Sequence, residues 1–203
     1  MSKRISCKPK TENRKPKIIG LTGGLASGKT TVLNQFEKLG VKTISCDEIA
    51  KKVFYGTNVP KKIKKLFGTL NRKKIAKIIF SDFAKRKQLE KILHPEIIKE
   101  LKKQFSILNS QFSIVVVDVP LLFEVHLEKM FDKIIVVYCK KNQQISRLMK
   151  RDKLTKSEAI KRIASQMPMG EKIKLADFTI KNTESLRRKK INSQVKKMLD
   201  KII

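Results

Sequence analysis

A glycine-rich segment that ends in lysine and threonine has the residue types and spacing of a phosphate-binding loop. The pattern G-x-x-x-x-G-K-[ST] is matched by Gly23-Gly24-Leu25-Ala26-Ser27-Gly28-Lys29-Thr30. In such loops the backbone N–H groups turn toward phosphate oxygens, and the dipole of the following helix adds to the attraction. Lys29 would reach the β- and γ-phosphates, and the Thr30 hydroxyl would bind Mg²⁺. We therefore expect the chain to bind a nucleoside triphosphate.

The residues on either side of this loop support that interpretation. The apolar run Ile18–Leu21 predicts a short buried strand that leads into the loop. Thr30–Leu39 predicts a helix that leads out of it, because its apolar residues fall on one face. The alternative is a glycine- and serine-rich turn that fits the pattern by chance, and such a turn would not require a strand before it and a helix after it.

Two aspartates lie at the end of a predicted strand or just after one, which places both at the sheet edge where the loop begins. Asp47 comes after the run Val41–Ser45 and could accept a proton from the hydroxyl of a phosphate acceptor, or hold Mg²⁺. It could equally cap the helix that follows. Asp118 ends the run Ile114–Val117, as the acidic residue of a Walker B strand does, and that residue reaches Mg²⁺ directly or through water.

Pro120 ends the strand that carries Asp118, since proline has no N–H to donate to a sheet. The chain must therefore turn at the same edge. We expect this turn to expose Leu121, Leu122 and Phe123 to a bound ligand. Packing of these side chains in the core beneath a helical cap is the alternative, and their spacing allows it equally well.

Three arginines on two neighbouring helices could act on a triphosphate. Arg147 and Arg151 are four residues apart, so they share one face of a predicted helix, and Arg162 lies on the next. The stretch over about 142–170 would form a lid that clamps the phosphates, supplies positive charge to the transition state and excludes water. A solvated cationic face is the alternative in so basic a chain.

Apolar or β-branched runs alternate with helical patterns along the chain. The runs are continuously hydrophobic, as strands of a parallel sheet buried on both faces are. Five strands are expected, at Lys17–Thr22, Val41–Ser45, Ser113–Val119, Lys133–Tyr138 and Phe178–Lys181. Helices are expected at Lys29–Leu39, Glu48–Tyr55, Pro60–Leu66, Arg72–Phe80, Phe83–Leu93, Pro95–Leu108, Asn142–Lys153, Lys156–Gln166 and Glu184–Lys201. The alternation predicts an α/β fold with three layers, α/β/α, around a five-stranded parallel sheet.

The domain organisation follows from the same pass along the chain. Residues 16–203 are expected to form one domain, preceded by a disordered basic tail over residues 1–15. The segment over about 59–109 is helical throughout, which predicts an inserted cap between two strands. Within it His94 precedes Pro95 at an expected break between helices, where a single histidine is more often structural than catalytic.

Composition limits the class of protein. The chain has 203 residues, with 48 Lys and Arg against 18 Asp and Glu and a formal charge of +30. Anionic partners agree with this charge, but the lysines are scattered and aromatic residues are sparse, so nucleic acid is not expected as an obligate partner. The three cysteines show no metal-ligand spacing, and we expect reduced thiols in a cytoplasmic protein. The apolar runs are too short to span a bilayer.

Several short motifs occur in order along the chain. They are Gly20-Leu21-Thr22-Gly23-Gly24-(x)₂-Ser27-Gly28-Lys29, Asp47-Glu48-Ile49-Ala50, Leu70-Asn71-Arg72, Ile79-Phe80, Leu93-His94-Pro95-Glu96-Ile97, Pro120–Glu124, Arg151-Asp152-(x)₂-Thr155-(x)₂-Glu158-Ala159-(x)₂-Arg162-Ile163-(x)-Ser165-Gln166-Met167-Pro168, Ala176-Asp177-Phe178 and Ile180-Lys181-Asn182. Together they resemble the dephospho-coenzyme A kinase family from about Ile18 to Ile203, and the lid stretch is the most specific of them.

The resemblance implies a P-loop nucleoside-triphosphate-hydrolase fold of the nucleotide-kinase kind with a helical substrate cap and a lid. It implies ATP-dependent phosphorylation of the ribose 3′-hydroxyl of dephospho-coenzyme A, the last step of coenzyme A synthesis. The expected nucleotide-binding residues are Gly23, Gly24, Leu25, Ala26, Ser27, Gly28, Lys29, Thr30, Thr31 and Arg162, with Thr30 and Asp118 at Mg²⁺. The expected catalytic residues are Lys29, Asp47, Arg147 and Arg151. The expected acceptor-binding residues are Asp47, His94, Pro120, Leu121 and Leu122.

Two other functions stay open on the sequence alone. One is a kinase of the same architecture that acts on a nucleoside monophosphate or another small alcohol. The other is a nucleic-acid-binding protein that uses ATP as a switch, which the charge of +30 suggests. We expect no membrane partner, and a monomer or a weak homo-oligomer.

Overall fold

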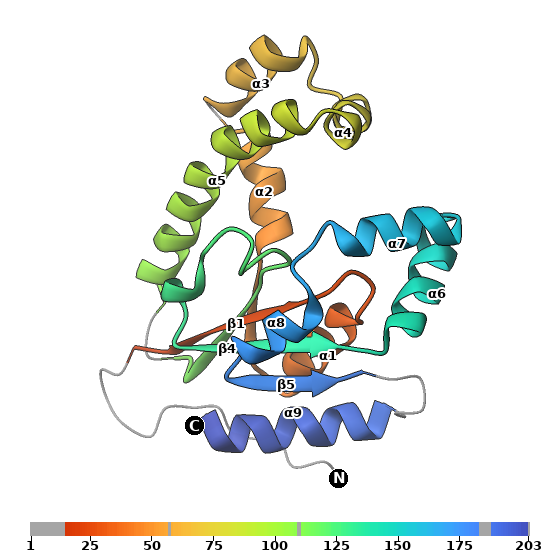
Figure 1. Cartoon of the computed structure of the whole chain (residues 1–203). Helices are drawn as coiled ribbons and strands as arrows, with labels where there is room; N and C mark the ends of the chain where they lie inside the picture. Colours follow the sequence, from red (N-terminus) through yellow and green to blue (C-terminus); the bar gives the residue numbers. More distant parts are fainter. Residues whose placement is uncertain (1–14, 57, 109–110, 183–187, 203) are drawn as a thin grey trace. The chain divides into compact units, whose positions relative to one another are not determined.

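The computed structural model describes residues 15–56, 58–108, 111–182 and 188–202 (Figure 1). The chain divides into two compact units. The sheet unit contains the residues up to Ile44 and from Leu108 onward, and the helical unit runs from Ser45 to Ile107. The helical unit therefore begins earlier in the chain than the insert predicted over about 59–109. The predicted tail over residues 1–15 lies outside the described residues except for Lys15, as does the predicted start of the last helix at Glu184.

The sheet unit is built on a parallel sheet of five strands in the order β2-β3-β1-β4-β5. The strands are β1 (Lys17–Gly23), β2 (Lys42–Ser45), β3 (Ile114–Asp118), β4 (Lys133–Tyr138) and β5 (Phe178–Lys181). All five were predicted from the sequence, to within one residue at each end. In the pairing of β1 with β3, Leu21 lies opposite Asp118, which brings the end of β3 beside the strand that leads into the glycine-rich loop.

Alternate residues of a strand point to opposite sides of a sheet, and the central strands β1, β3 and β4 are buried on both sides. One face packs against α1 (Lys29–Lys38) and α9 (Arg188–Ile202), through residues such as Ile19 and Val116. On the other face the segment after β3 lies close to β1, so that a Cβ at Gly20 would be 2.6 Å from a methyl group of Leu122. Burial on both sides explains why the central strands are continuous apolar runs. The edge strands β2 and β5 are partly exposed and contain polar residues, so the prediction of continuous hydrophobicity is wrong for them.

The remaining helices of the sheet unit follow β4. They are α6 (Lys141–Asp152), α7 (Lys156–Ala164) and α8 (Met169–Lys174), and a single 3₁₀ turn at Glu128–Met130 precedes β4. Helix α7 begins with a capping box, in which the Thr155 hydroxyl accepts the Glu158 N–H and the Glu158 carboxylate accepts the Thr155 N–H. The sequence did not predict α8, since six residues that include a glycine carry no helical periodicity.

The helical unit consists of four helices with an apolar core of their own. They are α2 (Cys46–Phe54), α3 (Val59–Phe67), α4 (Arg72–Ser81) and α5 (Phe83–Ser106). Side chains from each helix, including Phe54, Ile63, Ile75 and Leu89, meet in that core. In the part of the chain that the structure describes, no helix is long and apolar enough to cross a membrane.

Helix α5 is continuous, so the predicted break at His94 and Pro95 is wrong. Proline has no N–H, and the helix therefore lacks the hydrogen bond that residue 95 would donate to the carbonyl of Lys91. Leu89 and Leu101 are buried on either side of this point. The packing of these two leucines outweighs the local preference of proline for a helix start.

The carboxylate of Asp177, the residue before β5, contacts the start of β4. Asp177 accepts a hydrogen bond from the Ile134 N–H at 2.8 Å and pairs with Lys133 at 2.8 Å. Burial, the largest single influence, raises the pKa of Asp177, but the hydrogen bonds from Lys133 and Ile134 together outweigh it, so the pKa is lowered overall. Because the folded-state pKa is lowered, this stabilisation is present above the unfolded pKa and is lost as the pH falls through the folded value.

We therefore expect Asp177→Asn to lower the free energy of unfolding by about 1 kcal/mol at neutral pH, as the loss of an ion pair and a charged hydrogen bond does. The difference from the parent chain should shrink as the pH falls below the unfolded pKa of about 3.9. Urea unfolding at neutral pH and at a pH below about 3.9 measures this difference in the free energy of unfolding. Asp200→Asn, on the exposed side of α9, is the matched control. A difference that stays constant with pH would contradict this account.

Candidate active site

The glycine-rich loop connects β1 to α1 and is closed by its own backbone. Gly28 is the residue before α1 and has φ +87°, a left-handed conformation that glycine adopts without strain. Its carbonyl accepts hydrogen bonds from the N–H groups of Thr31 and Val32, and the Ser27 N–H donates to Gly24. The first N–H groups of a helix have no partner within the helix, so this end of α1 can bind an anion.

Asn182, directly after β5, is hydrogen-bonded to backbone carbonyl groups of the loop. The residue is 7% exposed, and its side chain donates hydrogen bonds to the carbonyls of Ser27 (3.0 Å) and Gly28 (3.4 Å). A Cβ at Gly28 would collide with this amide. Arg147, on α6, donates to the backbone carbonyl of Asn182 at 3.3 Å, so the structure brings one of the predicted arginines to the loop.

Lys29 and Asp118 form an ion pair beside the loop. The Lys29 Nζ is 2.6 Å from Asp118 Oδ1, and the two side chains are 15% and 12% exposed. Attraction between opposite charges is stronger in such a poorly solvated position than at an exposed surface. The lysine predicted to bind phosphate and the carboxylate predicted to bind Mg²⁺ therefore lie together.

The other two predicted arginines share a carboxylate. Arg151 binds both oxygens of Asp152, at 2.8 and 3.1 Å, and Arg162 reaches the same group at 2.8 Å. The hydrogen bonds from Arg151 are the main reason that the pKa of Asp152 is lowered, and the same bonds raise the pKa of Arg151. Arg151 and Arg162 thus form a cluster on α6 and α7, whereas Arg147 has a different partner.

The α6–α7 pair packs directly on the loop. Leu25 and Ala26 join the apolar cluster formed by Ile145, Leu148 and Ala159. The Leu25 N–H also donates to the carboxamide oxygen of Gln166, which follows α7, at 3.0 Å. Leu25 was predicted to bind nucleotide, but the structure gives its N–H to a side chain of the predicted lid.

The turn after β3 packs into the core at two of the three positions expected to face a ligand. Leu122 and Phe123 are fully buried, so the prediction that they are exposed is wrong. The missing side chain at Gly20 explains this, because it leaves room for Leu122 against β1. Pro120 and Leu121 are half-buried and keep part of their surface open.

Asp47 lies in the first turn of α2 and is exposed. The helix is capped by Ser45, whose hydroxyl accepts the Glu48 N–H at 3.4 Å. The interpretation of Asp47 as the cap is therefore wrong, and its carboxylate is not used for that purpose. Ser45 was predicted at the end of the preceding strand, and Glu48 at the start of the helix. The helix begins two residues earlier, at Cys46.

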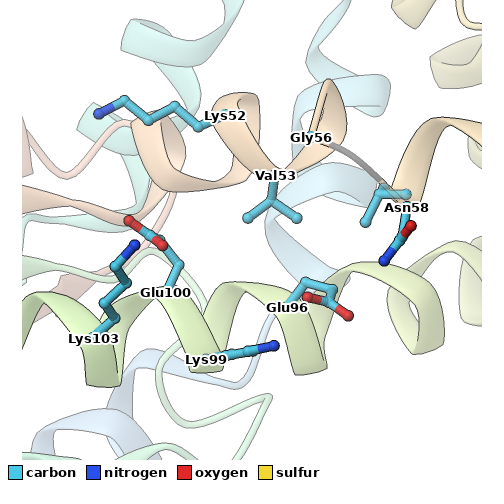
Figure 2. A pocket seen from close by; sticks show the side chains of 9 residues that line it. Lys52, Val53, Gly56, Asn58, Glu96, Lys99, Glu100 and Lys103 are labelled. Atoms are coloured by element: carbon cyan, nitrogen blue, oxygen red, sulfur yellow. The ribbon is translucent and has the colours of Figure 1, made fainter.

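A cavity of about 580 Å³ lies between α2 and α5 within the helical unit (Figure 2). Lysines from both helices and glutamates from α5 line it together. Its lining residues are Lys52, Val53, Gly56, Asn58, Val59, Glu96, Lys99, Glu100 and Lys103. Neither Asp47 nor His94 is among them. The cavity therefore does not coincide with the acceptor-binding residues predicted in this unit.

Within the described residues, no group of three or more His, Cys, Asp or Glu side chains could hold a metal ion. A Mg²⁺ that is bound through a nucleotide needs no such group, because phosphate oxygens and water supply most of its ligands. The Thr30 hydroxyl and the Asp118 carboxylate are oxygen donors of the kind that this ion prefers. The residues present at the loop thus fit a magnesium–nucleotide complex.

A glycine-rich loop that runs from the central strand of a five-stranded parallel sheet into a helix defines a P-loop kinase fold. The family model described as dephospho-CoA kinase matches residues 17–188. A dephospho-CoA kinase of Listeria monocytogenes is 42% identical over 92% of this chain and 98% of its own, and one of Bacillus licheniformis is 41% identical over 90% and 95%. The chain belongs to the dephospho-CoA kinase family.

Solved structures agree with this assignment. A Thermus thermophilus protein matches with a TM-score of 0.81 and 30% identity over 94% of this chain and all of its own. A dephospho-CoA kinase from Campylobacter jejuni matches with a TM-score of 0.63 and 30% identity over 93% and 98%. Shikimate kinase from Bacteroides thetaiotaomicron, at 17% identity and a TM-score of 0.54, shares the fold.

Gly28→Ala should disturb the loop in two ways, through its positive φ and through the collision with Asn182. Gly40→Ala is the matched control, because Gly40 has a similar φ of +82° but an open space where a Cβ would lie. We expect both variants to lose about 1 kcal/mol of stability from the backbone conformation. Only Gly28→Ala should also weaken ATP binding, by about tenfold or more on the scale of one to two lost hydrogen bonds.

Thermal unfolding and calorimetric titration with ATP separate the two effects. Equal ATP affinities for Gly28→Ala and Gly40→Ala would show that the contact with Asn182 does not shape the loop.

Proposed function

We propose that this chain transfers the γ-phosphoryl group of ATP to the ribose 3′-hydroxyl of dephospho-coenzyme A, giving coenzyme A and ADP. The observation that carries the proposal is a complete phosphate loop, with Lys29 beside Asp118, in a chain that belongs to the dephospho-CoA kinase family. The predicted cytoplasmic location and monomeric or weakly associated state remain predictions from the sequence.

The loop from Gly23 to Thr31 would hold the triphosphate. Its backbone N–H groups and the start of α1 would bind phosphate oxygens, and Lys29 would bind the β- and γ-phosphates. Thr30 and Asp118 would hold Mg²⁺, which when bound would neutralise negative charge on the triphosphate. Leu25 would contribute through the shape of the loop, since its N–H is bonded to Gln166.

Asp47 would accept the proton of the 3′-hydroxyl. It comes two residues after Ser45, which ends β2, and its exposed carboxylate is not needed as a helix cap. Phosphoryl transfer proceeds through a loose transition state with little bond formation to the acceptor, so the placement and the charge of this carboxylate should matter more than its basicity.

Arginines would supply the positive charge that faces the transferred phosphoryl group. Arg147 donates a hydrogen bond to the backbone of Asn182, which in turn contacts the loop. Arg151 and Arg162 are both hydrogen-bonded to Asp152, which fixes their positions. Fixed cations of this kind stabilise the charge that develops on the equatorial oxygens. For the acceptor, we propose contacts with His94 in the helical unit and with Pro120 and Leu121; the burial of Leu122 leaves it a packing role.

A substrate panel tests the reaction. ADP release should depend on dephospho-coenzyme A, and should be at background with nucleoside monophosphates, with shikimate, and with DNA or RNA. The first two acceptor classes represent other P-loop kinases, and the nucleic acids represent an ATP switch. Turnover only with a nucleoside monophosphate, or ATPase activity stimulated by nucleic acid with a steep salt dependence, would overturn the proposal.

Lys29→Met should lower turnover by about a hundredfold or more, as the removal of one preorganised charge at a developing anion does. Lys38→Met, at the exposed end of the same helix, is the control and should behave like the parent chain. Coupled ADP-release assays give the rates, and circular dichroism shows that both variants are folded. Turnover of Lys29→Met within a few-fold of the parent would contradict the role given to the loop.

Asp47→Asn should lower turnover by about a hundredfold, the lower range for a lost general base, with little change in ATP affinity or thermal stability. Glu48→Gln is the matched control, because it removes the same charge from the neighbouring exposed residue in the same helical turn. The rate at saturating substrate and the ATP dissociation constant distinguish the two. An equal loss of rate in both variants would indicate a general effect of charge and not proton transfer.

A further inference from the structure

Lys172, on α8, is the one fully buried lysine among those whose side chains the structure describes, and the proposed mechanism does not use it. Its Nζ lies 2.6 Å from Oε1 of Glu124, at the end of the turn after β3. The lysine is fully removed from water and the Glu124 side chain is only 19% exposed, and an apolar pair of similar size often stabilises a fold equally well or better. Stability alone therefore does not account for this pair.

Glu124 has a second partner, which connects the ion pair to the next segment of the chain. The same oxygen that faces Lys172 accepts the backbone N–H of Met167 at 3.1 Å. Met167 lies between α7 and α8, and the residue before it is Gln166. A carboxylate that accepts a backbone N–H fixes the position of that peptide, and a charged acceptor does so more strongly than a neutral one.

Gln166 completes a path to the phosphate loop. Its carboxamide oxygen accepts the Leu25 N–H at 3.0 Å. Met169, three residues after Gln166, also approaches the loop. A Cβ on Gly24, the residue before Leu25, would be 2.8 Å from the terminal methyl of Met169. Contacts thus run without interruption from the buried ion pair to two consecutive residues of the loop.

We propose that Glu124 and Lys172 are positioning residues for the phosphate loop. The ion pair fixes the peptide of Met167, and through it the place of the Gln166 carboxamide, which holds the Leu25 peptide so that the neighbouring N–H groups are oriented toward phosphate. The inference rests on the proposed ATP-binding role of the loop. It does not depend on which acceptor receives the phosphoryl group.

Gln166→Leu tests the last contact of the path without disturbing the buried charges. Leucine has nearly the volume of glutamine but cannot accept the Leu25 N–H. The ATP dissociation constant, measured by calorimetry without an acceptor, should rise about threefold to tenfold, the loss expected for one hydrogen bond. The melting temperature should change little.

The double variant Glu124→Leu/Lys172→Met tests the pair itself. It removes both charges together and leaves neither one buried without a partner, so the chain should fold. It should raise the ATP dissociation constant by a similar factor. Adding Gln166→Leu to it should raise the constant no further, because the three residues act through the same contact.

A second ion pair of the sheet unit supplies the control. Lys133 and Asp177 also pair, and Asp177 also accepts a backbone N–H, at the start of β4. Lys133→Met/Asp177→Leu should lower stability and leave the ATP dissociation constant within about twofold of the parent, as a site without a shared partner does.

Three results would overturn the proposal: an unchanged ATP dissociation constant in Gln166→Leu, independent losses that multiply in the triple variant, or an equal loss in the Lys133 and Asp177 control. Because ATP binding is measured alone, an absence of turnover with dephospho-coenzyme A would overturn the proposed reaction and leave this inference standing.

Discussion

A phosphate loop must leave its N–H groups open on one side, and its carbonyl groups on the other side then need donors from the rest of the chain. In this protein one such donor is the Asn182 carboxamide, which reaches the carbonyls of Ser27 and Gly28. Strand β5 ends directly before Asn182, and the absence of a side chain at Gly28 leaves room for the amide. The end of β5 thus supports one backbone segment of the loop.

Much of the sheet unit could be predicted from local patterns, because the central strands β1, β3 and β4 are buried on both faces and are therefore mostly apolar. The loop, with Lys29 and Thr30, was predicted for a similar reason, since its function depends on residues that are consecutive in the chain. Asp118 was found because it ends a strand. Its pairing with Lys29 is consistent with the register of β1 and β3.

The contacts that support the loop could not be predicted in this way, since they join residues far apart in the sequence. Asn182 and Gln166 are 155 and 141 residues from their partners at Ser27 and Leu25. Pattern also gave no information on which of two neighbouring polar residues caps α2, and the structure assigns that role to Ser45. At Pro95 a local rule failed because packing on both sides of the proline outweighed it.

The contact of Leu25 and Ala26 with α6 and α7 has a thermodynamic consequence for any opening of these helices. Separation from the loop would expose the apolar surface that Ile145, Leu148 and Ala159 bury there. Exposure of apolar surface to water raises the heat capacity, so opening would carry a positive heat-capacity change. The apolar part of the resistance to opening would therefore weaken as the temperature falls.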